Sequence, residues 1–291
     1  MGLGDFFKNI FGKKNCALCG KECGMMHRSK IRNKEFLCDD CGNLCSKYIR
    51  LSELTLDEVK GHIEYMKRQN RLFEEVYSKE GKKDTYPSSL KEMGIEFCDD
   101  LGMFRIKYRS NTGRGKMNEL FRYDQVASYE EYIDETPATE PGKNPEFKEC
   151  GLKIKLLGGN MSKVNTDNKK GLRPHPYIKH EIKVCFSKKD RSDLHAHNAK
   201  CKFDYIFGVH DDERGLFGFG RSKAEKREDA AAIGMAAAFG TAFKAATKGE
   251  EAITEADKEK LKEGINAMND AATGGMAVYT RRADDAEAKI K

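Results

Sequence analysis

Six cysteines in the first 45 residues repeat one spacing, and this repeat constrains the fold of the N-terminal region more than any other feature. The two copies are Cys16-x2-Cys19-x3-Cys23 and Cys38-x2-Cys41-x3-Cys45, with 18 residues between the two C-x2-C pairs. Each C-x2-C pair turns two thiolates toward one point, and two pairs supply the tetrahedral sulfur set that zinc prefers. The spacing therefore predicts one Zn²⁺ per chain, held by Cys16, Cys19, Cys38 and Cys41.

The spacing alone leaves two alternatives open. The cysteines could form disulfides in a small secreted domain, although the first residues, MGLGDFFKNIFGKKN, lack the basic-then-apolar order of a secretion signal. The repeat could also hold a two-zinc cluster on all six cysteines. Because each further thiol lies one helical turn beyond its pair, we expect Cys23 and Cys45 to lie beside the site without binding the metal.

Composition points to a soluble intracellular setting. The chain has 291 residues, of which 34% are charged, and it contains no uninterrupted run of 18 apolar residues that would predict a membrane-spanning helix. Ten cysteines without a secretion signal favour a reducing compartment. We therefore expect a cytoplasmic protein, with peripheral contact at a membrane as the alternative.

Basic residues gather between the two cysteine pairs. The net charge is +6, and the first 50 residues carry ten Lys/Arg against five Asp/Glu. The cluster consists of Arg28, Lys30, Arg32 and Lys34. It could bind phosphates of nucleic acid or of an anionic lipid surface, or it could be a solvated arm of the zinc module. Phe36 is the only Phe, Tyr or Trp between Cys23 and Cys38, so stacking on bases is not favoured.

Residues 1–14 predict a short amphipathic segment. Its apolar residues follow the three-to-four spacing of one helical face, namely Leu3, Phe6, Phe7, Ile10 and Phe11. Such a face could dock on the protein itself, on a partner protein, or in a membrane interface.

The rest of the chain predicts an α+β protein in several parts. After the zinc module at 15–50, residues 51–86 predict a helical spacer that starts at a Thr55/Glu58 capping box. Period-two alternation then predicts antiparallel strands between 95 and 220, in a sandwich or partly open barrel with a core separate from the module. These strands pass through Phe104–Tyr108, Leu152–Leu156, Ile182–Phe186 and Phe203–Phe207. Residues 221–291 predict helices, the first capped by Ser222, with disorder left open for the tail.

Three short runs resemble a known module. They are Asn15-Cys-Ala-Leu-Cys-Gly-Lys-Glu, Arg28-Ser-Lys-Ile-Arg and Phe36-Leu-Cys-Asp-Asp-Cys. Together they resemble an uncharacterised bacterial zinc-ribbon-like domain of unknown function, whose members often join the module to a β-domain resembling a bacterial PH fold. Leu120-Phe-Arg-Tyr-Asp-Gln-Val, followed by Ser128-Tyr-Glu, resembles the strand pair that opens such a domain. The resemblance implies metal binding by the two C-x2-C pairs and no catalytic residue.

No enzymatic function is predicted. No local signature supports a Ser/His/Asp or Cys/His nucleophile, so we expect neither catalysis nor a small-molecule substrate. His195, His197 and Cys201 offer ligand types close in sequence, but such a pattern in a polar stretch is usually solvated. The sequence favours a non-enzymatic zinc-binding adaptor that contacts an unknown protein or a membrane surface. The alternative is a nucleic-acid-binding protein that uses the basic cluster.

Overall fold

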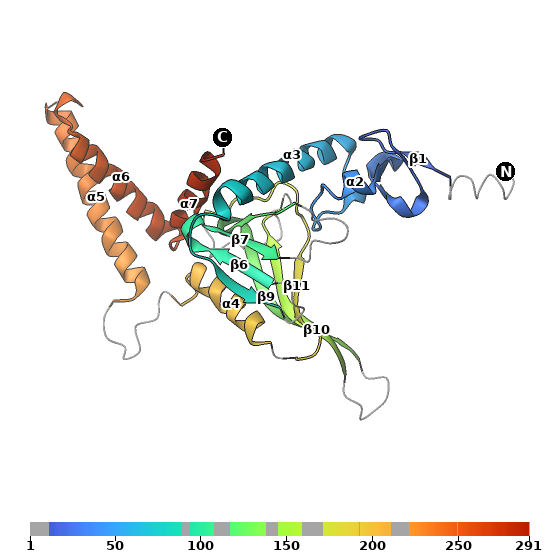
Figure 1. Ribbon diagram of the computed structural model, residues 1–291. Helices are drawn as coiled ribbons and strands as arrows, with labels where there is room; N and C mark the ends of the chain where they lie inside the picture. The colour runs from blue at the N-terminus through green and yellow to red at the C-terminus, as the bar shows by residue number, and fades with distance from the viewer. Residues whose placement is uncertain are drawn as a thin grey trace.

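The computed structural model describes residues 12–88, 94–107, 117–137, 145–158, 171–191, 193–210, 221–248 and 250–290. Within these ranges the chain forms an N-terminal cysteine module, a long helix, several small antiparallel sheets and a group of C-terminal helices (Figure 1). The predicted mixed α+β class is confirmed. The apolar face predicted at Leu3, Phe6, Phe7, Ile10 and Phe11 lies outside the described residues.

The cysteine module contains two very short antiparallel ribbons. Strands β1 (Lys14–Asn15) and β2 (Glu22–Cys23) form the first ribbon, and β3 (Arg28–Lys30) and β4 (Phe36–Cys38) form the second. Helix α2 (Asp39–Gly42) follows β4, and single 3-10 turns lie at Met25–His27, Arg32–Lys34 and Leu51–Glu53. Ribbons of two or three residues per strand are not stable alone in water, so the module needs further fixation.

Helix α3 (Leu56–Leu72) begins where the sequence predicts, and a π-helical turn (Phe73–Tyr77) continues it. Thr55 Oγ1 accepts a hydrogen bond from the Glu58 amide at 3.3 Å, and Glu58 Oε2 accepts one from the Thr55 amide at 2.7 Å. This confirms the capping box. The helix buries one face through Val59, Ile63 and Met66, and it runs from the module along the sheets (Figure 1).

Seven strands form two antiparallel sheets in chain order. The first sheet contains β5 (Asp84–Pro87), β6 (Gly94–Cys98), β7 (Met103–Lys107) and β8 (Phe121–Arg122). The second contains β9 (Val126–Thr136), β10 (Glu146–Leu156) and β11 (Ile182–Ser187). The predicted strands in β7, β10 and β11 are confirmed, whereas β8 and β9 belong to different sheets instead of pairing with each other. Among the described residues the sheets form no closed barrel.

The strand predicted at Phe203–Phe207 is wrong, because this segment belongs to helix α4 (Leu194–Ile206). The buried positions of α4 are Ala196, Ala199, Phe203 and Ile206, apart from Asp204 near its end, and they recur every three or four residues. The aromatic alternation masked this helical period. The Phe203 ring packs between the two sheets, with ring centroids 4.9 Å from both Phe97 and Tyr129.

Three further helices complete the chain: α5 (Lys223–Lys248), α6 (Glu255–Ala272) and α7 (Met276–Ala288). Ser222 caps α5 as predicted, since its Oγ accepts from the Glu225 amide at 3.1 Å. Helices α5 and α6 form a hairpin that projects from the body, whereas α7 returns to it (Figure 1). The tail, for which the sequence left disorder open, forms α7 and buries Ala283 and Ala286.

One contiguous apolar core joins the module to the β-domain, so the expectation of a separate core is wrong. Buried residues from Cys16 to Ile63 belong to the same cluster as those of both sheets and α4. The Tyr48 ring meets Phe121 edge-on at 5.7 Å between centroids. Ser46 Oγ donates to Glu119 Oε2 at 2.5 Å.

Two buried histidines lie where α3 meets the β-domain. His175 Nδ1 accepts a hydrogen bond from the Ile178 amide at 3.0 Å, and its Nε2 lies 3.0 Å from the Tyr65 hydroxyl. Burial, assisted by nearby His62, lowers the pKa of His175 to about 3. Burial lowers the pKa of His62 to about 4. Both rings are therefore neutral in the folded chain at neutral pH.

Because His62 and His175 are buried as neutral rings, we expect the protein to lose stability in acid. Below the ordinary histidine pKa of about 6.5 the unfolded chain binds more protons than the folded one, so the free energy of unfolding falls as pH falls. His175→Asn keeps an acceptor for the Ile178 amide but removes one titrating ring. Between about pH 4 and about pH 6, the substitution should lower the slope of unfolding free energy against pH by up to about 1.4 kcal/mol per pH unit.

Denaturant titrations of the wild type and the variant at several pH values measure this slope. Glu119, whose pKa is raised to about 7 by burial, shifts stability in the opposite direction over this range, and the comparison cancels its effect. His195→Asn, at an exposed position of α4, serves as the control. Equal slopes in the wild type and His175→Asn would show that His175 does not titrate as a buried neutral group.

Candidate metal centre

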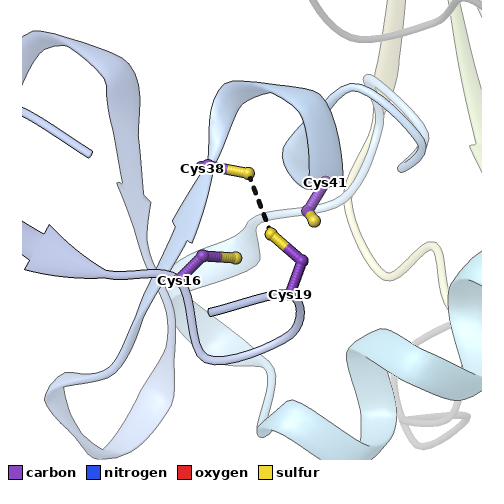
Figure 2. Close-up of side chains that lie close together, drawn as sticks. All are labelled: Cys16, Cys19, Cys38 and Cys41. Atoms are coloured by element: carbon purple, nitrogen blue, oxygen red, sulfur yellow. Dashed lines mark hydrogen bonds between the residues drawn. The ribbon is translucent and has the colours of Figure 1, made fainter. Parts of the chain in front are cut away.

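The two C-x2-C pairs meet at one point in the structure. The Sγ atoms of Cys16, Cys19, Cys38 and Cys41 all lie within 4.8 Å of one another (Figure 2). The Cys19 and Cys38 sulfurs are 3.7 Å apart. Four thiolates about 2.3 Å from a tetrahedral zinc ion are separated by about 3.8 Å, so the donor set fits zinc. The geometry suggests a metal site without identifying the ion, because iron also accepts four thiolates.

Local backbone structure explains this convergence. Cys16 follows β1, and the chain then turns so that the Gly20 amide donates to the Cys16 carbonyl at 2.8 Å. Gly20 has a φ of +76°, a conformation that glycine adopts without steric penalty. Cys38 ends β4 and immediately precedes α2, which carries Cys41. The Ala17 amide donates to the Phe36 carbonyl at 2.8 Å and joins the two halves of the site.

The thiols interact electrostatically. Burial raises the pKa of the Cys16 thiol, but hydrogen bonds from the Cys38, Cys19 and Leu18 amides outweigh burial and lower it to about 6. Burial, followed by the neighbouring thiols, raises the pKa of Cys41. Four crowded thiols therefore do not ionise together easily, and a divalent cation supplies the charge that stabilises the four-thiolate state.

Cys23 and Cys45 lie outside this sulfur cluster. Both are buried, and they donate to backbone carbonyls, Cys23 to Lys14 at 3.1 Å and Cys45 to Cys41 at 3.9 Å. Burial raises the pKa of Cys23, which favours its thiol form. The structure thus places both residues as buried thiols that pack beside the site.

The basic cluster is only partly available to solvent. Arg28 lies over the Phe36 ring at 4.7 Å from its centroid and donates to the Gly12 carbonyl at 2.7 Å. Lys30, Arg32 and Lys34 are exposed. The Phe36 ring is half-buried, and Arg28 covers one side of it, which leaves less of the ring available for base stacking.

The structure contains a second group of possible metal ligands, of which the sequence predicts only a part. His197 Nε2 lies 3.5 Å from Cys201 Sγ, and His197 Nδ1 lies 3.0 Å from Glu131 Oε1. The i,i+4 spacing of His197 and Cys201 on a helix would have indicated their contact. Glu131 comes from β9, and no local signal predicts it. All three side chains are exposed, and His197 and Cys201 supply only two ligand atoms for a metal.

Comparison with known proteins identifies the module alone. A protein-family model described as "Domain of unknown function (DUF4428)" matches residues 14–62. This segment starts at β1, includes all four clustered cysteines and ends inside α3. No curated protein and no solved structure matches the chain. The match supports the predicted resemblance for the cysteine module.

The site predicts one tightly bound zinc ion per chain. Elemental analysis of protein purified without chelator should give a zinc-to-protein ratio near one. Cys19→Ser should remove most of it, because three thiolates do not complete the closed tetrahedral set. Cys201→Ser, at the exposed cysteine of α4, should leave the ratio unchanged.

The zinc-to-protein ratio also distinguishes the four-cysteine site from a six-cysteine cluster and from a protein without a structural metal. A value near two that falls in Cys23→Ser and Cys45→Ser variants would establish a six-cysteine cluster. A metal-free protein that keeps its fold would exclude a structural metal.

Proposed function

We propose that this protein is a non-enzymatic adaptor in which a structural zinc ion fixes the N-terminal module against a PH-like β-domain. The convergence of four sulfurs within 4.8 Å is the observation that carries this proposal. All four positions of a tetrahedral zinc would be filled by cysteine, which leaves no open position for water or substrate. The zinc would hold the fold of the module and would take no part in catalysis.

The arrangement of the β-domain supports the PH-like part of the proposal. A four-stranded antiparallel sheet is followed by a three-stranded one, and a helix follows both. Helix α4 closes the space between the sheets, since Phe203 contacts Phe97 of the first and Tyr129 of the second. Two open sheets closed by one C-terminal helix are the arrangement expected of a PH-like domain. Such a domain is a scaffold for binding surfaces, and the fold alone does not fix what it binds.

The partner that we propose is a protein, contacted in the cytoplasm, with a membrane surface as the second possibility. The apolar segment at 3–11 supplies the anchor, because aromatic side chains contribute more to interfaces than charges at their rim. Nucleic acid is less favoured. Arg28 is engaged with Phe36, and Lys21 pairs with Asp40 at 2.6 Å, which reduces the positive charge the module offers to phosphates.

Two matched variants test this choice. One carries Phe6→Ser and Phe7→Ser, and the other replaces all four basic residues of the cluster, Arg28, Lys30, Arg32 and Lys34, by Gln. The Phe6→Ser, Phe7→Ser variant should recover less of a protein partner or co-sediment less with liposomes than the wild type. The charge variant should behave nearly as the wild type in both assays. We expect only weak binding of the wild type to DNA or RNA, with an affinity that falls as salt rises.

One result would contradict the adaptor proposal. If the wild type binds nucleic acid with sub-micromolar, sequence-selective affinity, and only the charge variant loses this binding, the protein is a nucleic-acid-binding protein. Zinc content should be measured in both variants, so that loss of the module is not mistaken for loss of a binding surface.

A further inference from the structure

A thiol, an imidazole and a carboxylate contact one another in sequence on the surface of α4. Cys201 Sγ lies 3.5 Å from His197 Nε2, and His197 Nδ1 lies 3.0 Å from Glu131 Oε1 of β9. We call these three residues the thiol triad. His197 and Cys201 are one helical turn apart on the exposed face of α4, whose opposite face packs between the sheets through Phe203. The triad therefore lies outside the core and away from the four-cysteine cluster.

The hydrogen bonds of the thiol triad have a defined direction. A carboxylate oxygen only accepts, so His197 donates its Nδ1–H to Glu131. A neutral imidazole carries one hydrogen, so Nε2 is left with a lone pair, and Nε2 is the atom that faces the Cys201 thiol. Cys201 is thus the donor and His197 Nε2 the acceptor, which is the arrangement in which an imidazole can take the proton of a thiol.

The same contacts argue against a metal ion at this place. Glu131 and Cys201 contact different nitrogens of one ring, so their ligand atoms do not converge on a common centre. Within the described ranges, the one group of three or more ligand atoms that does converge is the four-cysteine cluster. A nucleophile, a base and a third group that orients the base are instead the combination that activates a thiol toward an electrophile.

Cys201 is the accessible thiol of the chain outside the metal centre. All ten cysteines lie in the described ranges, and only Cys19 and Cys201 are exposed. Cys19 belongs to the four-cysteine cluster. Burial raises the pKa of Cys150 and raises that of Cys185 to about 11, so both stay protonated and shielded. A reagent dissolved in water therefore meets Cys201 first in the zinc-loaded chain.

The surroundings of His197 leave room for a reacting molecule. A cavity of about 400 Å³ opens beside the imidazole, with Glu131 and His197 in its wall. Tyr132, Ile133 and Ala196 give another part of this wall an apolar character. Because a cavity of about 150 Å³ already accepts a molecule of the size of benzene, a small and partly apolar compound fits here.

A positive charge also lies near the thiol. Lys200 Nζ donates to Asp204 Oδ2 at 2.7 Å, and this hydrogen bond is the main cause of the raised pKa of Lys200. Cys201 and Glu131 raise the same pKa further, which shows that the ammonium group lies close to both. It can therefore stabilise negative charge that develops on the Cys201 sulfur during an attack.

The position of Cys201 along the chain leaves it open to dissolved reagents. By length and composition, Lys223–Thr247 is the one helix in the described ranges that could cross a membrane, which is weak evidence, and the sequence predicted none. Cys201 lies outside this helix, on the exposed face of α4.

We propose that Cys201 is a modification site that reacts with small uncharged disulfides, with His197 as the general base. As Cys201 Sγ attacks one sulfur of the disulfide, its proton passes to His197 Nε2, while Glu131 holds the imidazole in place. A new bond joins Cys201 Sγ to that sulfur, the S–S bond of the reagent breaks, and the departing sulfur takes the proton from Nε2. One thiol and one disulfide thus become a mixed disulfide and a new thiol. This site is independent of the zinc site and of the adaptor function.

The test is the rate at which the zinc-loaded full chain reacts with 4,4′-dithiodipyridine, an uncharged aromatic disulfide whose thiol product is measured by its absorbance. One equivalent per chain should react in a fast phase, and Cys201→Ser should abolish this phase. His197→Ala should slow it by about tenfold or more, because the base is removed. The control, His195→Asn, changes an exposed position of the same helix outside the triad and should react at the wild-type rate.

Two further measurements distinguish a chemical role from a structural one. Free imidazole in the buffer should restore much of the lost rate in His197→Ala and change the wild-type rate little. Glu131→Gln should slow the wild type about threefold, because Nδ1 loses a charged acceptor, but should have no further effect when His197 is already Ala. Circular dichroism and zinc content of each variant should match the wild type, because all these positions are exposed.

Three results would overturn the proposal. If His197→Ala reacts as fast as the wild type, Cys201 is an ordinary exposed thiol. If the fast phase persists in Cys201→Ser, the reactive thiol lies elsewhere in the chain. If His197→Ala is slow and free imidazole does not accelerate it, His197 affects Cys201 through packing and not as a base.

Discussion

The convergence of four cysteine sulfurs is the constraint on which the N-terminal part of the structure depends. The ribbons of the module contain strands of two or three residues, and such strands cannot hold their own register in water. Fewer than about 40 residues also bury too little apolar surface to fold without a cross-link, a metal or external packing. A metal on Cys16, Cys19, Cys38 and Cys41 would tie the end of one ribbon to the start of α2 and so fix both ribbons at once.

Packing against the rest of the protein is the second interaction that stabilises the cysteine module. Helix α3 starts inside the segment that the family model matches and buries its apolar face against the β-domain. Ser46 bonds to Glu119, and the exposed Glu53–His180 pair, with Oε2 and Nε2 3.0 Å apart, adds a contact at the edge. The module therefore presents its outer surface from a defined position on the β-domain.

Sequence reasoning succeeded where a structure depends on neighbouring residues. The cysteine spacing and the caps at Thr55 and Ser222 are local signals, and the structure contains all of them. It failed at α4, because an aromatic residue at every second position also fits a helix that buries Phe203 between two sheets. Which side chains become buried in the folded chain decides whether such a segment forms a strand or a helix. The shared core and the Glu131–His197 contact depend on residues far apart in the sequence, and no local pattern contains them.

Hydrogen exchange on the zinc-loaded full chain, with and without a chelator, tests most directly whether the metal-fixed module and the β-domain share one core. Chelation should release the amides of residues 14–54, and the loss of protection should extend into the first turns of α3 and to Tyr177 and Ile178, which pack beside it. The far strands β9 and β10 should stay protected, because most of their hydrogen bonds are with each other. Loss of protection that stops at residue 50, with α3 and residues 171–187 unchanged, would contradict this account and restore two independent units.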